Sequence, residues 1–255
     1  MIVEHVQRWS ERRGTYRPAR EVVSTRTLEV ALIAPRVAKA FVEAHHYSGR
    51  CGPTAHPFGL HDRGELVGVA AFGPPPSMNA HRAVWPTCTT DEAVTLSRFV
   101  LVDQVGANAE SWFFARCLEL LRPRGVIAIE SCADPRWGHV GTIYQATNGR
   151  YVGTTRPATI HVFEDGRVLD NRTEGKVRRG EVGRAYAVGQ LVERGATPPR
   201  AGEDMRAWLA RWTAALTRSV RHRGKHRYLW CLDRRRARAI LRAPARPYPK
   251  VLTPC

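Results

Sequence analysis

The chain has 255 residues, of which 43% are hydrophobic and 8% aromatic, so it can build one large domain, or one domain with an extension, around a sizeable core. Its formal net charge of +17 favours a polyanionic partner, with nucleic acid ahead of an anionic membrane surface. Because no apolar run reaches transmembrane length and the first residues are charged throughout, we expect no membrane partner, no secretory signal, and free cysteines in a reducing cytoplasm.

The predicted elements begin with an antiparallel pair of strands and continue as a strand–helix–strand centre. Pro35 followed by apolar residues at helical spacing predicts the first helix. The β-branched and aromatic residues of 93–102 predict a strand, and the apolar run 125–131 predicts a strand buried on both faces. This order indicates an α/β fold with a mixed central sheet flanked by helices. In chain order we expect a helix over 35–47, two strands within 57–73, a loop over 75–92 and a strand over 93–102. These are followed by a helix from Ser111, a strand over 125–131, a short helix over 139–148, and two strands within 151–163 before an Asp165-Gly166 turn.

Basic charge is concentrated in the last part of the chain. Residues 200–255 hold 15 Lys and Arg against 3 Asp and Glu, whereas residues 1–199 hold 25 against 20. Aromatic residues such as Trp208 and Trp230 lie among these cations, which is typical of a nucleic-acid-binding segment, although a solubilising surface has the same charge. The cations that we expect to contact DNA are Arg221, Arg223, Lys225, Arg227, Arg234 and Arg235.

These patterns predict three parts of the chain. Residues 1–170 form a catalytic domain that begins with an Arg-rich segment over 1–30, and the charged, Gly-rich residues 171–203 form a linker. Residues 204–255 form a basic, aromatic, helical DNA-binding extension with helices over 204–217 and 234–243.

A Gly-containing loop at 103–110 joins a predicted strand to a predicted helix. Such a loop exposes backbone N–H groups, and the helix dipole adds positive charge, so it is suited to a phosphate or pyrophosphate. An ordinary turn would have the same composition. The loop residues are Gln104, Val105, Gly106, Ala107, Asn108 and Ala109.

Several reactive side chains follow the buried strand at its carboxyl end, where open sheets bind ligands. Ser131, Asp134 and His139 lie there, and the two titratable groups can act as base, acid or metal ligand. Asp134 can equally be the cap of a following helix. Tyr144, just beyond, can protonate a leaving thiolate or belong to the core.

The sequence His45-His46-Tyr47 closes the first predicted helix. Neighbouring helical residues point about 100° apart, so both histidines do not easily bind one metal ion. We expect one of them to be catalytic and the other structural.

Seven short motifs occur in a characteristic order across roughly residues 37–155. Together they resemble the Mom family of phage DNA-modification proteins, and the run Gly138 to Ala146 is the most distinctive of them. The motifs are His45–Gly49, Phe72–Pro75, Leu96–Arg98, Asn108–Phe113, Ala133–Pro135, Gly138–Ala146 and Asn148.

The resemblance implies a GNAT-like acyltransferase fold with acetyl-CoA or a related acyl-CoA on the strand–loop–helix. Ala107 departs from the usual GNAT loop, which has a glycine at that place. The residues expected to bind the cofactor are Gln104, Gly106, Asn108, Ala109, Ser111 and Asn148.

The resemblance also implies a catalytic set. Tyr144 is the acid near the thioester, Ser97 and Arg98 line the cleft, and iron or another metal remains open as a cofactor. The full expected set is His45, His46, Tyr47, Ser97, Arg98, Ser131, Asp134, His139 and Tyr144.

The activity implied by the resemblance is carbamoylmethyl-type modification of the N6 amino group of adenine in double-stranded DNA, which protects the DNA from restriction. The first alternative is an ordinary GNAT N-acyltransferase acting on a protein, an RNA or a small-molecule amine. The second is a DNA-binding protein without enzymatic activity, which would leave the polar motifs at 131–148 without a purpose.

Overall fold

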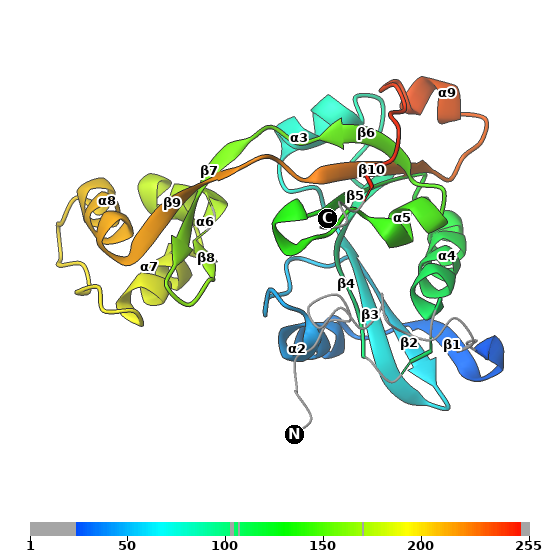
Figure 1. Cartoon of the computed structure of the whole chain (residues 1–255), viewed down its shortest axis with the longest axis horizontal. Coiled ribbons are helices and arrows are strands. Elements are labelled where there is room, and N and C mark those ends of the chain that lie inside the picture. The colour runs from blue at the N-terminus through cyan, green and yellow to red at the C-terminus, as the bar shows by residue number, and fades with distance from the viewer. Residues whose placement is uncertain (1–23, 103–104, 107, 170, 251–255) are drawn as a thin grey trace, which may run out of the picture. The chain divides into compact units, whose positions relative to one another are not determined.

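The computed structural model describes residues 24–102, 105–106, 108–169 and 171–250. These residues fold as two compact units. The main unit comprises the chain up to Thr155 together with the chain from Lys225, and the inserted unit is Arg156–Gly224 (Figure 1). Each unit is described by itself. In the described ranges, no helix combines the length and hydropathy needed to span a bilayer.

The main unit is built on a mixed sheet. Among the described residues it has seven strands in the order β1-β2-β3-β4-β5-β10-β6. Neighbouring strands are antiparallel except β4 and β5, which are parallel. The predicted α/β fold with a mixed central sheet is therefore confirmed. The strands are β1 Leu28–Leu32, β2 His56–Asp62, β3 Glu65–Gly73, β4 Ala93–Leu101, β5 Ala128–Ala133, β6 Arg150–Thr154 and β10 His226–Cys231.

Helices cover both faces of this sheet (Figure 1). Helix α2 (Pro35–His45) packs Ala38 and Val42 against Val69 and Val100. On the other face, α4 (Ala109–Leu121) packs two phenylalanines into the main core. The remaining helices of this unit are α3 Met78–Val84, α5 Thr142–Ala146 and α9 Ala237–Ile240, with 3₁₀ turns η1 Thr25–Thr27, η2 Arg122–Arg124 and η3 Pro135–Trp137.

Strand β10 corrects the predicted boundary of the C-terminal extension. It lies between β5 and β6, and its Tyr228, Leu229 and Trp230 are buried. The predicted separate extension over 204–255 is therefore wrong as a domain, because its second half completes the central sheet. The cations on both sides of this short apolar run hid a strand that is buried on both faces.

The inserted unit has its own sheet and its own core. Its sheet has the order β8-β7-β9, and its core joins Phe163, Leu191, Trp208 and Leu209. The elements are β7 Ala158–Phe163, β8 Val168–Leu169, α6 Asn171–Arg179, α7 Arg184–Val192, α8 Met205–Leu216 and β9 Thr217–His222.

The predicted linker over 171–203 is consequently wrong. Helices α6 and α7 lie within it and bury Val177, Ala187 and Leu191. Their helical pattern is short and interrupted by glycines and charges, which is why it resembled a linker. The predicted helix over 204–217 is confirmed by α8, while α9 is shorter than the predicted 234–243.

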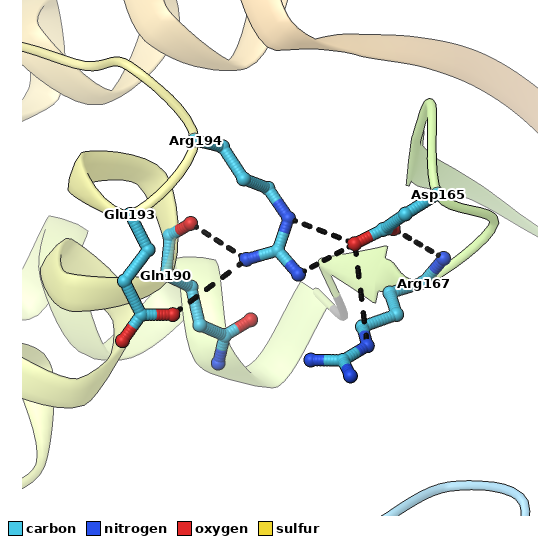
Figure 2. A network of polar contacts seen from close by, with 5 residues as sticks. All are labelled: Asp165, Arg167, Gln190, Glu193 and Arg194. Carbon is cyan, nitrogen blue, oxygen red and sulfur yellow. Dashed lines mark hydrogen bonds and ion pairs between the residues drawn. The ribbon is translucent and has the colours of Figure 1, made fainter.

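The side chain of Arg194 links the β7–β8 turn to α7 by hydrogen bonds (Figure 2). Its guanidinium donates to Asp165 Oδ2 at 3.2 and 2.7 Å and to the carbonyl oxygen of Gln190 at 2.9 Å. It also lies 4.4 Å above the Phe163 ring. This bidentate, stacked arginine is a structural clamp of the inserted unit.

Most other predicted elements are confirmed with small shifts in their ends, and one loop is wrong. Residues 75–92 contain α3, which begins where Ser77 Oγ accepts from the Ala80 N–H at 3.1 Å. This helix buries His81 and leads to buried Trp85. The preceding Pro74-Pro75-Pro76 run suggested a continuous loop, but proline is compatible with a segment just outside a helix.

Candidate active site

The site is organised by the place where β4 and β5 part. The two strands pair from Ala93 and Ala128 to Leu96 and Ser131. Beyond this point β4 continues beside β3, and β5 continues beside β10. Polar groups from both strands therefore gather at the carboxyl edge of the parallel pair, as the sequence predicts.

Ser131 and Tyr144 meet at this parting point. Ser131 is fully buried, and its Oγ lies 2.9 Å from the Tyr144 hydroxyl and 3.2 Å from the Leu96 carbonyl oxygen. Burial raises the pKa of Tyr144, and the hydrogen bond from Ser131 opposes this only in part. Tyr144 therefore keeps its proton near neutral pH and is suited to donate it.

Two glycines shape the loop between β5 and α5. Gly138 and Gly141 have φ of +74° and +79°, and a Cβ on Gly141 would lie 2.5 Å from the Tyr228 ring. The Tyr228 hydroxyl donates to the carbonyl of Val140. Strand β10 thus holds in place the loop that carries His139.

A second group of side chains gathers around Tyr47. Its ring stacks on His46 at 4.3 Å and contacts Trp137 and His139, with centroid distances of 5.3 and 5.7 Å. Asp134 raises the pKa of Tyr47 further, after the larger effect of burial. Residues predicted from three separate motifs therefore lie in one cluster.

His46 and His139 are both held neutral. Burial, followed by the charge of Arg98, lowers the pKa of His46 to about 3. Burial lowers the pKa of His139 to about 4, although Asp134 acts in the opposite direction. The Ser48 N–H donates to His46 Nδ1 at 3.1 Å, so the His46 proton belongs on Nε2.

The two adjacent histidines have separate surroundings. His46 is buried in the Tyr47 cluster, whereas the His45 ring packs 4.5 Å from the Phe41 ring on its own helix. The structure thus brings His46, and not His45, to the other predicted residues.

Asp134 fits both roles that the sequence left open. Its Oδ1 accepts from the Arg136 N–H at 3.0 Å, which caps the Pro135–Trp137 turn. Its Oδ2 lies 3.5 Å from Lys225 Nζ, and the side chain is 12% exposed. The cap fixes the carboxylate at the edge of the cluster and uses only Oδ1, so that Oδ2 can take part in other contacts.

Ser97 and Arg98 lie on β4 just past the parting point. Ser97 Oγ donates to the Ala71 carbonyl oxygen at 3.1 Å, and Arg98 Nε donates to the Arg50 carbonyl oxygen at 2.5 Å. Ser97 is therefore engaged with the sheet, while Arg98 adds positive charge beside His46.

Glu130 escaped sequence analysis, and Arg227, which was predicted to contact DNA, pairs with it instead. Arg227 Nε lies 3.0 Å from Glu130 Oε1, and the Glu130 side chain is only 8% exposed. Burial raises the pKa of Glu130, which Arg227 partly opposes, and burial with Glu130 raises the pKa of Cys132 to about 12. A glutamate within an otherwise apolar strand was the available signal.

Three of the predicted cofactor residues line one cavity of about 560 Å³ between α4 and the end of α5. The α4 N-terminus has Asn108 in a left-handed conformation without a side-chain cap hydrogen bond, and the positive end of the helix dipole there favours an anion. Ala109 is fully buried instead, and Gln104 lies outside the described residues. Those three are Asn108, Ser111 and Asn148, with Trp112, Ala115, Ala146 and Thr147 among the other lining residues.

Among the described residues, no group of three or more His, Cys, Asp or Glu side chains has the arrangement of a metal site. Cys51, Cys88, Cys117, Cys132 and Cys231 are free thiols, as expected.

The six cations predicted to contact DNA are divided between the two units. Arg221 and Arg223 are exposed in the inserted unit, whereas Lys225 and Arg227 face carboxylates in the active site. Arg234 and Arg235 follow β10 at the opposite end of the sheet, because Cys231 pairs with Ala128 at the amino end of β5.

Comparisons with known proteins agree with the resemblance seen in the motifs. A model of the Mom protein family matches residues 27–250. The methylcarbamoylase mom of Escherichia phage Mu is 28% identical over 159 residues, which span 61% of this chain and 65% of that protein.

The solved structures that match this chain include two N-acetyltransferases. One from Staphylococcus aureus Mu50 is 9% identical, with a TM-score of 0.39 and coverage of 81% of this chain and 99% of that one. A GNAT-family N-acetyltransferase of Escherichia coli in complex with CoA is 12% identical, with a TM-score of 0.35 and coverage of 52% and 72%.

Proposed function

The chain belongs to the Mom protein family, and on this premise we propose that it is a transferase that modifies the N6 amino group of adenine in double-stranded DNA. The transferred group is of the carbamoylmethyl type, which is bonded to N6 through its CH2 and ends in an amide. The donor of its two carbons is acetyl-CoA or a related acyl-CoA. Because simple acyl transfer from acetyl-CoA would give an N-acetyl group, the reaction from acetyl-CoA also requires an ammonia-level nitrogen donor and a two-electron oxidant. The observation that carries the proposal is the cluster of His46, Tyr47, Asp134 and His139 beside the parting strands, where family motifs far apart in sequence meet.

The cluster has the chemistry that an adenine acceptor needs. An enzyme that acts on a base of a duplex must extrude it and hold it by stacking and polar contacts. The tilted rings of Tyr47 and Trp137 supply aromatic surface for stacking, and the neutral imidazole of His46 supplies a hydrogen-bond donor. These features suit an uncharged purine better than a cationic amine.

The proton of the amino group needs an acceptor as the new bond forms. Adenine N6 is conjugated with its ring and is a weak nucleophile, so removal of this proton must accompany attack. We assign Asp134 this role, because one of its oxygens is fixed by the Arg136 N–H and the other faces Lys225. The carboxylate of Asp134 lies close enough to His139 to raise the pKa of its imidazole, although burial keeps that imidazole neutral. His139 can therefore share the proton with Asp134.

Tyr144 is assigned as the proton donor to the leaving group. A serine hydroxyl has one proton, and Ser131 can donate it either to the Leu96 carbonyl or to Tyr144. When it donates to Tyr144, the phenol proton is free to point elsewhere. Burial keeps this phenol protonated.

The cavity beside α4 suits the donor. An acyl-CoA bound there would supply the two carbons of the transferred group, and its sulfur would leave as a thiolate. Asn108, Ser111 and Asn148 would hold its phosphate-bearing part, with help from the first-turn N–H groups of α4. Glu110, also in the first turn, opposes an anion and limits the affinity.

Protection from restriction follows from the position of the modified atom. The N6 amino group of adenine is a hydrogen-bond donor in the major groove, and proteins that read adenine use it together with N7. A bulky substituent on N6 removes one donor hydrogen and blocks the approach of a reading side chain.

An ordinary N-acyltransferase is the second candidate, because the donor cavity would serve it equally well. The purified chain should be incubated with labelled acetyl-CoA and a cell extract, and label should be counted in DNA, RNA and protein fractions separately. Label in protein or RNA alone would favour the second candidate, whereas label in duplex DNA supports the proposal.

A further inference from the structure

Helices α6 and α7 of the inserted unit form a helix–turn–helix. They are joined by residues 180–183, in which Gly180 and Gly183 have φ of +67° and +87°. The Glu181 N–H donates to the Lys176 carbonyl oxygen at 2.9 Å, which closes α6. Two helices linked by a four-residue turn with glycine are typical of a DNA-reading element.

The packing of the two helices determines which residues face outward. Val177 of α6 and Ala187 and Leu191 of α7 are buried against Trp208 and Leu209 of α8. The opposite side therefore presents the turn and the first residues of α7 to solvent. Here the exposed side chains are Val182 (96% exposed), Arg184 and Tyr186 (54% exposed).

The charge of the inserted unit complements a polyanion. The segment 156–224 holds 14 Lys and Arg against 8 Asp and Glu. Two of these acids near the turn have arginine partners: Glu174 is buried with Arg178 at 2.5 Å, and Glu181 pairs with Arg179 at 2.5 Å. The excess positive charge of the unit therefore lies on its exposed arginines, which include Arg184 at the start of α7.

The edge strand adds a second basic row. Strand β9 lies at the edge of the β8-β7-β9 sheet, and Arg218 and Arg221 on it are exposed. Exposed arginines of a DNA-binding unit are suited to phosphates, and such contacts fix the position of the protein on the duplex. Residues at the start of a recognition helix reach the base edges.

We propose that the inserted unit reads duplex DNA by placing the start of α7 in the major groove. Arg184 contacts a guanine edge, Tyr186 and Val182 contact base edges and thymine methyl groups, and β9 contacts the phosphates. This inference rests on the proposed function, for which it supplies the element that selects the sequence around the modified adenine. Duplex DNA is the partner.

The test is binding of the full chain, without donor, to a fluorescent duplex, measured by anisotropy at several salt concentrations. Arg184→Ala should weaken binding about tenfold, as expected for the loss of a bidentate base contact. Arg206→Ala is the matched control, because Arg206 is an exposed arginine on α8 of the same unit; it should change affinity less than about twofold.

A second readout separates base contact from general charge. Arg184→Lys keeps the positive charge but lacks the two parallel N–H donors of the guanidinium. The variant should therefore lose discrimination between duplexes of different sequence, while the slope of log affinity against log salt concentration stays the same. Arg221→Ala should lower that slope by about 0.9, because it removes one phosphate contact. Circular dichroism melting confirms that the variants are folded.

Two results would overturn the inference: Arg184→Ala binding duplex DNA as Arg206→Ala does, or single-stranded RNA of the same length competing as well as the duplex. The outcome is independent of modification. If DNA from expressing cells has no modified nucleoside but α7 variants lose duplex binding, the proposed function fails and this inference stands. If modification occurs and α7 variants bind normally, only the inference fails.

Discussion

The active site of the main unit and the inserted unit both carry many cations, but they use them differently. In the active site, Lys225 and Arg227 of β10 face the carboxylates of Asp134 and Glu130. In the inserted unit, arginines such as Arg184 and Arg221 lie exposed. The largely buried carboxylates of Asp134 and Glu130 need cationic partners, whereas exposed arginines of the inserted unit remain available to a ligand. Net charge alone therefore does not locate a binding surface.

The comparison separates chemistry from binding. The main unit has neutral histidines, a protonated phenol and paired charges, which suit proton transfer in a site with little water. The inserted unit has an apolar core and a charged outside, which suit recognition. Variants in one unit should therefore leave the property of the other largely intact.

The largest effect is expected at the reacting groups. Asp134→Asn, which keeps the helix cap, and Tyr144→Phe, which removes one hydroxyl, should each lower modification by about 100-fold or more, because a positioned acid or base contributes at least that much. Modified nucleoside should be measured at equal protein levels. Duplex binding is the control and should change little; a variant that modifies DNA at the wild-type rate loses its assigned role.

The next effect concerns the buried ion pair. Arg227→Ala leaves Glu130 buried without this partner and should lower the free energy of unfolding by about 3 kcal/mol. Arg221→Ala removes an exposed arginine and should change it by less than about 0.5 kcal/mol. Urea unfolding of both proteins measures the difference. Equal stabilities would contradict the distinction drawn between the two units.

Donor binding should be confined to the main unit. Coenzyme A at about 100 times its Kd should stabilise the fold by about 2.7 kcal/mol and raise the Tm. Ser111→Glu places a second acid in the first turn of α4 and should abolish this shift, whereas Arg206→Glu in the inserted unit should preserve it. No change of Tm for the wild type at millimolar coenzyme A would remove the donor assignment.

The smallest effect is a dependence of stability on pH. The pKa of His46 is lowered to about 3 and that of His139 to about 4, from an ordinary value of 6.5. Between these values the unfolded state binds more protons than the folded state, so stability is present above pH 6.5 and is lost as pH falls toward 4.

The expected slope is about 1.4 kcal/mol per pH unit for each histidine at pH values between its two pKa values. His46→Gln should reduce the slope. Urea unfolding at pH 7, 6 and 5 measures it, and an identical slope in the variant would show that His46 is not held neutral.

Local patterns predicted much of the main unit. The β-branched run of β4 and the Pro35 start of α2 are each set by neighbouring residues, and both were predicted. Asp134 and Tyr144 could be selected because open sheets concentrate function at the carboxyl edge of their strands. His46 enters the site because the chain leaves the helical conformation after His45, the last residue of α2. The spacing of residues in the sequence alone does not predict which of the two histidines enters the site.

Non-local pairing accounts for what the sequence did not predict. The Glu130–Arg227 contact requires β10 to lie beside β5 in a register that pairs Cys132 with Arg227, across about a hundred intervening residues. Helix α6 has few apolar residues, and its burial depends on the core formed with Trp208. Neither fact has a local signature, so a strand and a folded unit were both interpreted as parts of a basic tail.

The most direct test of the central claim is the nucleoside content of DNA from cells that express the chain. Enzymatic digestion followed by mass spectrometry should give a modified deoxyadenosine with the mass of an added carbamoylmethyl group, and fragmentation should keep that group on the base. DNA from cells expressing Asp134→Asn, matched for protein level, should lack it. Unmodified adenosine in both samples, or an equal amount of the modified form in both, would contradict the account.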